Sequence, residues 1–104
     1  MSTRNILLDI GMNLSRISSW TIEDYSSKKK RIEMFFEQTS RDLQLLDASS
    51  MPTKSSEFAV KRFKGEYSLL KSAVLNSSSP NLIISERLLT WGSILTHKAN
   101  LFDK

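Results

Sequence analysis

Hydrophobic residues recur along most of the chain at intervals of three and four, the spacing that places side chains on one face of an α-helix. Polar segments divide these residues into four stretches, and no stretch sustains the alternation that is typical of a β-strand. We therefore predict an all-α fold, an antiparallel up-down bundle of about four helices joined by short loops. Residues 1–104 form a single domain, because a chain of this length does not supply two hydrophobic cores.

The four predicted helices run from about Thr3 to Ser19, Ile22 to Asp47, Ser55 to Asn76 and Pro80 to Phe102. Their apolar faces, in chain order, are Leu7, Ile10, Leu14 and Ile17; Tyr25, Ile32, Phe36, Leu43 and Leu46, with Thr39 in register; Val60, Phe63, Tyr67, Leu70 and Val74; and Ile84, Leu88, Trp91, Leu95 and Phe102. We predict that these side chains form the core.

Serine clusters before the two prolines predict loops at 47–52 and 76–80, because serine side chains compete for backbone hydrogen bonds and proline cannot continue a helix. We predict a third break at 18–21, where Thr21–Asp24 resembles a capping box with Asp24 in place of the usual Glu. A single kinked helix through this region is the alternative. Gly11, Gly65 and Gly92 fall inside predicted helices, and we interpret them as sites of close helix crossing.

The chain contains no cysteine, so neither disulfides nor thiolate-bound zinc can stabilise the fold. Residues 1–12 lack the continuous apolar segment of a signal peptide, and the longest apolar run, Leu82 to Ile84, is far too short to span a membrane. We therefore expect a cytoplasmic protein without a membrane span.

Candidate chemistry is sparse. His97 is the only histidine, and although Ser93 precedes it by one helical turn, no third group is positioned to orient the imidazole. Acidic residues show no Glu-x-x-His spacing, and no glycine-rich nucleotide motif occurs. We therefore predict a protein that is not an enzyme, with no catalytic, cofactor-binding or metal-ligating residues and no cofactor.

Positive charge is concentrated in the middle of the chain. The net charge is +4, and residues 28–71 alone carry ten Lys and Arg against six Asp and Glu. The run at the start of the second predicted helix and a stripe on the third helix could merge into one surface for an anionic partner. This candidate surface comprises Lys28, Lys29, Lys30, Arg31, Lys61, Lys64 and Lys71.

Several apolar residues lie outside the predicted core faces. The candidate partner surface consists of Leu8 and Met12 on the first helix and Leu82 and Leu89 on the fourth. Smaller sets occur elsewhere: Met34 with Leu45, Phe58 with Leu69, and Ile83, Ile94 and Leu101. Apolar pairs at helical spacing on exposed faces are typical of contact surfaces.

These patterns favour a non-enzymatic helical protein-interaction module, such as an adaptor, small chaperone or regulatory subunit. We expect it to bind a protein partner, by self-association as a homo-oligomer or by contact with another helical protein. The alternative is a nucleic-acid-associated protein that uses the basic region 28–71. A more distant alternative is a small-molecule binder or enzyme with a pocket flanked by His97.

Overall fold

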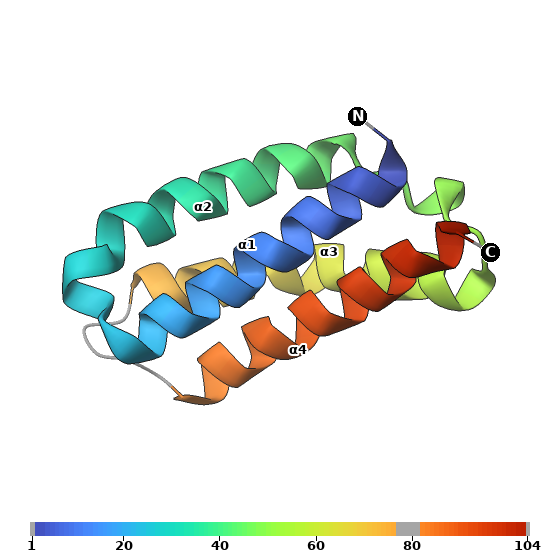
Figure 1. Cartoon of the computed structure of the whole chain (residues 1–104). Coiled ribbons are helices and arrows are strands. Elements are labelled where there is room, and N and C mark those ends of the chain that lie inside the picture. Colours follow the sequence, from blue (N-terminus) through green and yellow to red (C-terminus); the bar gives the residue numbers. More distant parts are fainter. Residues whose placement is uncertain (1, 77–81, 104) are drawn as a thin grey trace.

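The computed structural model describes residues 2–76 and 82–103 and contains four α-helices and two short 3-10 helices. The α-helices are α1 (Thr3–Glu23), α2 (Tyr25–Leu45), α3 (Lys54–Leu75) and α4 (Leu82–Ala99), with 3-10 segments at Ala48–Ser50 and Asn100–Asp103. Consecutive helices run in opposite directions (Figure 1). The predicted all-α antiparallel bundle is confirmed.

The first helix extends further than predicted. The Thr21 hydroxyl donates to the carbonyl oxygen of Ile17 at 2.7 Å. This hydrogen bond lies within α1, so Thr21 does not cap the next helix. The chain turns at Asp24, whose backbone N–H donates to the Trp20 carbonyl at 3.1 Å. The predicted break at 18–21 and its capping box are therefore wrong, although α1 and α2 are separate helices.

The serine-rich loop at 47–52 is confirmed. Asp47 accepts the backbone N–H of Ser49 at 2.9 Å, which fixes a short 3-10 turn. A capping box then starts α3, in which the Thr53 hydroxyl accepts from the Ser56 backbone and the Ser56 hydroxyl accepts from the Thr53 backbone. Helix α3 ends at Leu75, and residues 77–80 of the second predicted loop lie outside the described part of the chain.

The core matches the predicted apolar faces closely. All of the named side chains on α1 and α3 are buried, whereas Leu43, Ile84 and Phe102 are only half-buried and pack against the core. Sequence periodicity missed four apolar core residues: Ile6, Ala48, Met51 and Ala99. Two of them lie in or beside the 47–52 loop, which has no helical period.

Helix α1 lies between α2 and α4 and packs most extensively against α4 (Figure 1). The α1–α4 contact is made by small residues. A Cβ built on Gly92 would lie 2.9 Å from the Gly11 carbonyl oxygen, so the two backbones touch. About two turns from this crossing, Ser18 and Ser85 exchange hydroxyl-to-carbonyl hydrogen bonds, both 2.7 Å long.

Helix α3 is held by large aromatic side chains instead. The rings of Phe63 and Trp91 lie 5.3 Å apart between α3 and α4, and those of Phe36 and Tyr67 lie 6.2 Å apart between α2 and α3. The Tyr67 hydroxyl also donates to the Phe36 carbonyl at 2.7 Å. Because rings fill these interfaces, α3 approaches its neighbours far less closely than α1 approaches α4.

The three glycines therefore have different roles. Gly11 and Gly92 form the close crossing that we predicted. Gly65 does not, because it is exposed on α3 and a Cβ added there would have no neighbour within 4 Å. The predicted crossing at Gly65 is wrong.

Candidate functional site

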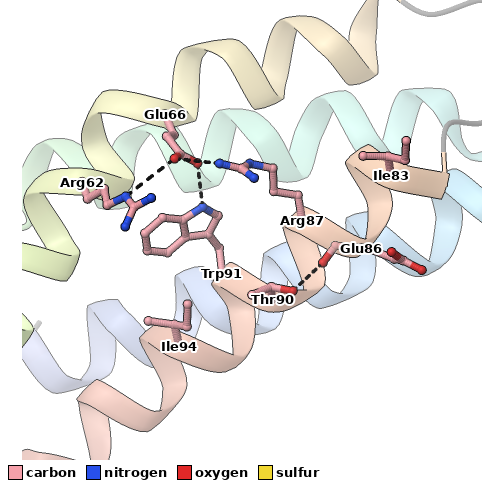
Figure 2. Close-up of a pocket in the computed structure, with 8 residues that line it drawn as sticks. All are labelled: Arg62, Glu66, Ile83, Glu86, Arg87, Thr90, Trp91 and Ile94. Atoms are coloured by element: carbon pink, nitrogen blue, oxygen red, sulfur yellow. Dashed lines mark hydrogen bonds and ion pairs between the residues drawn. The ribbon is translucent and has the colours of Figure 1, made fainter.

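A cleft of about 390 Å³ opens between α3 and α4. Trp91 lies in it, with Arg62 and Glu66 on the α3 side (Figure 2). The side chains that line it are Arg62, Glu66, Ile83, Glu86, Arg87, Thr90, Trp91 and Ile94. The cleft exists because the aromatic rings beneath it keep α3 and α4 apart.

Glu66 links the two sides of this cleft. Its carboxylate accepts from the Trp91 indole N–H at 3.0 Å and from the Arg87 guanidinium at 2.8 Å, and Arg62 lies at 3.9 Å (Figure 2). The indole hydrogen bond, followed by the bond and charge of Arg87, holds the Glu66 pKa below its ordinary value. Glu66 is therefore ionised at neutral pH and satisfied by donors from the protein.

Apolar residues lie near both ends of the cleft: Phe58, Leu69 and Ile83 are exposed, whereas Ile94 is half-buried and packs against the core. On α3, Phe58 and Leu69 share a helical stripe with Arg62, because their offsets from it are four and seven residues. On α4, Ile83 and Ile94 share a stripe with Arg87 in the same way. The antiparallel register set by Glu66 and Arg87 brings Leu69 and Ile83 to one end, and Phe58 and Ile94 to the other.

The predicted partner surface is divided by the structure. Leu8 and Met12 line a groove of about 540 Å³ between α1 and α4, together with Asn5, Asp9, Gly11, Ser15 and Thr96. Met12 is 47% exposed, whereas Leu8 is half-buried and packs against the core. The α1 half of the predicted surface is thus partly used by the fold itself.

Leu82 and Leu89 lie on α4 and are 60% and 49% exposed. The Ser18–Ser85 bonds place Leu82 beside the C-terminal end of α1, whereas Leu8 lies near its N-terminal end. Leu8 and Leu82 are therefore separated by about 20 Å along the helix axes. The four residues are therefore spread along the α1–α4 pair, with Leu8 and Leu82 at opposite ends.

The basic run Lys28–Arg31 lies in the first two turns of α2. Lys29, Lys30 and Arg31 are exposed, and Lys28 is half-buried. Lys29 lies over the Tyr25 ring at 5.9 Å, and none of the ion pairs between described residues includes a member of this run. Lys28 lies in the first turn of α2, where a cation opposes the helix dipole.

The α3 lysines are divided in a similar way. The Tyr25 hydroxyl donates to the Val74 carbonyl at 2.6 Å, which brings Lys71 to the level of the basic run. Lys61 and Lys64 lie about 10 to 15 Å further along α3. Lys61 pairs with Glu57 at 3.3 Å, and the Lys64 ammonium donates to the carbonyl at the end of α2.

His97 lies beside a shallow hollow of about 320 Å³ with Ser15, Gly92, Ser93, Thr96 and Asn100. Both His97 and Ser93 are exposed. In the described part of the chain, neither ring nitrogen of His97 forms a hydrogen bond, so the imidazole is not oriented toward the serine hydroxyl. This hollow provides no activated nucleophile.

Two carboxyl groups meet between α1 and α2. Asp42 is 9% exposed, its Oδ2 atom has no hydrogen-bond partner, and Asp9 lies within hydrogen-bonding reach. Burial, the hydrogen bond with Asp9 and the Asp9 charge raise the pKa of Asp42 to about 7. Sequence spacing could not reveal this pair, because the two residues are 33 positions apart.

Residues 2–76 and 82–103 contain no group of three or more His, Asp or Glu side chains arranged to hold a metal ion. No helix formed by these residues is both long enough and apolar enough to cross a membrane.

The sequence pattern pairs Phe58 with Leu69, and Ile83 with Ile94, but it does not connect the two pairs. The sequence feature that could have connected them is the equal spacing of 11 residues within each pair, on consecutive helices. Comparisons with protein-family models, with curated proteins and with solved structures found no match.

Proposed function

We propose that this protein is a non-enzymatic interaction module that binds a helical protein, or a second copy of itself, through the outer side of α4. The proposal rests on the large apolar side chains that α4 exposes. Helix α4 is an edge helix packed on α1 and α3, yet Leu82, Ile83 and Leu89 are 60%, 74% and 49% exposed. Exposed apolar side chains that share one helix are characteristic of contact surfaces.

A cytoplasmic adaptor, small chaperone or regulatory subunit would use such a face. The absence of cysteine suits a reducing compartment.

The experiment replaces Leu82 and Leu89 with serine and measures association of the whole protein by sedimentation and by affinity capture from native lysate. We expect weaker association with little change in helicity, because both side chains are largely exposed. Met34→Ser is the matched control, since Met34 is 48% exposed on α2. A wild-type protein that is strictly monomeric at high concentration and captures nothing contradicts the proposal.

A second candidate function is association with nucleic acid through the basic region 28–71. The observation in its favour is the run Lys28–Arg31, whose cations take part in no ion pair between described residues. Nuclease treatment of the native complex separates the two functions. Loss of the complex on treatment, with strong dependence on salt, supports nucleic acid.

A further inference from the structure

We infer that the α3–α4 cleft binds one amphipathic helix of a partner protein, and that this helix carries acidic side chains at the centre of the contact. The inference rests on the proposed function. It adds a contact on the side of α4 that faces α3, where Ile83 lies, beyond the contact at Leu82 and Leu89, and it adds the chemistry of the partner. Three features of the cleft support it: its length, the shape of its α3 side and the balance of its charges.

The apolar ends of the cleft match the dimensions of a helix. Phe58 and Leu69 on α3, and Ile83 and Ile94 on α4, are each separated by 11 residues, or about 16 Å along the helix axis. Leu69 and Ile83, at one end, are the two most exposed large hydrophobic residues described, at 73% and 74%. An amphipathic helix with apolar residues at positions i, i+7 and i+11 would contact both ends.

The centre of the α3 side has room for a second backbone. Gly65 lies on the same side of α3 as Arg62 and Leu69, at offsets of three and four residues. No atom lies within 4 Å of a Cβ built on it. Since no contact within the protein requires glycine here, the depression it leaves is open to a docked helix.

The charges at the centre favour an acidic occupant. Arg62 and Arg87 converge on the single carboxylate of Glu66, which also accepts from Trp91, so two positive charges share one negative charge. The Arg62 and Arg87 side chains are 62% and 52% exposed, and each guanidinium retains N–H donors that can bind a further carboxylate. Glu86 also lines the cleft, but it forms no ion pair with Arg62 or Arg87 and its side chain extends along α4 away from Trp91 (Figure 2).

The same charges disfavour a second copy in this cleft. A two-fold contact would bring a second Arg62 and Arg87 together with a Glu66 that already accepts from its own chain, and each chain carries a net charge of +4. A partner helix with an unpaired Glu or Asp at its centre can bind the N–H donors that Arg62 and Arg87 retain.

The experiment selects displayed peptides of about five helical turns on the folded, full-length protein. Leucines are fixed at intervals of three and four, and every other position is allowed to be Glu or Lys. We expect Glu to be enriched over Lys. We also expect the selected peptide to bind roughly tenfold more weakly to Leu69→Ser/Ile83→Ser and several-fold more weakly to Arg62→Gln, with affinity falling as salt is added.

Met34→Ser is the control and should bind the selected peptide as wild type does. Enrichment of Lys, absence of enrichment, or a Glu-rich peptide that binds Leu69→Ser/Ile83→Ser normally overturns the inference. The inference is also overturned if sedimentation shows that Leu69→Ser/Ile83→Ser dissociates a homodimer, because a second copy of the chain then occupies the cleft. Failure of the proposed function is recognised separately, by a wild-type protein that is monomeric and captures no partner.

Discussion

The Gly11 carbonyl oxygen lies only 2.9 Å from the position that a Cβ on Gly92 would occupy. Both glycines are helical, and glycine in a helix interior costs about 1 kcal/mol relative to alanine. The close backbone contact between α1 and α4 explains why the fold retains them in spite of that cost.

We expect Gly92→Ala to destabilise the protein by about 1 to 3 kcal/mol, because the new methyl group meets backbone that cannot move aside. Gly65→Ala should have the opposite effect and stabilise it by about 0.5 to 1 kcal/mol, since space is open there and alanine is the better helix former. Urea unfolding of the two variants measures both changes. A stabilising Gly92→Ala would show that α1 and α4 do not cross at these residues.

The aromatic layer under the cleft provides a second prediction. Phe63 is completely buried, and Phe63→Ala should cost about 3 to 5 kcal/mol, as should the loss of the Trp91 ring in Trp91→Ala. Trp91→Phe retains the ring but loses the indole donor to Glu66, so it should cost about 1 kcal/mol. Near-neutral stability of both alanine variants would mean that the helices are packed in another register.

The pKa of Glu66 gives an independent measure of the hydrogen bond that is lost in Trp91→Phe. The low pKa of Glu66 depends first on the Trp91 hydrogen bond, so the pKa should rise in Trp91→Phe. Titration of the carboxyl carbon by NMR measures this shift. An unchanged pKa would show that Arg87 alone sets it.

The Asp9–Asp42 pair predicts a dependence of stability on pH. The Asp42 pKa is about 7 in the folded protein and near 3.8 when unfolded, so ionisation costs more in the folded state. The stability that Asp42 contributes is fully present below the unfolded-state pKa of 3.8 and is lost as pH rises through the folded-state pKa of about 7. We expect the free energy of unfolding to fall by about 2 kcal/mol between pH 5 and 8.

Asp42→Asn is the matched variant and should remove most of this slope. Glu66 does not obscure the result, because a lowered pKa affects stability only in more acidic solution, where that carboxylate becomes protonated. Urea unfolding at several pH values in this range makes the comparison. Equal slopes for wild type and variant would show that Asp42 is ionised in the folded protein.

The α3 lysines are expected to be secondary for binding. Lys61 is paired with Glu57, and Lys64 donates to the Leu46 carbonyl, so both take part in contacts within the fold. Replacement of Lys61, Lys64 and Lys71 with glutamine should leave the principal partner bound, apart from a salt-dependent component. Sedimentation of the complex at two salt concentrations tests this. If the native complex contains DNA or RNA and the triple variant loses it, the nucleic-acid function is correct.

Local patterns predicted the helices and most of the core because the period of an amphipathic helix is visible within one segment. The position of the first break could not be predicted in this way. The Thr21 hydroxyl could either cap the next helix or bond within its own helix, and it donates to the Ile17 carbonyl. Gly65 and Gly92 are indistinguishable in sequence, because only the neighbouring helix decides whether a glycine is crowded. The α3–α4 cleft and the Asp9–Asp42 pair depend on residues brought together by packing, which no single segment contains.

The closest helix contact joins the first helix to the last, and this has a consequence for how the chain is made. During synthesis, α1 can pair with α2 early, but the side of α1 that meets α4 stays uncovered until residues 82–99 have emerged. Closing so long a loop is entropically costly and belongs to the slow part of folding. Until α4 emerges, the nascent protein therefore exposes Leu7, Leu14 and the glycine contact to the cell, and a chaperone or a premature partner could occupy them.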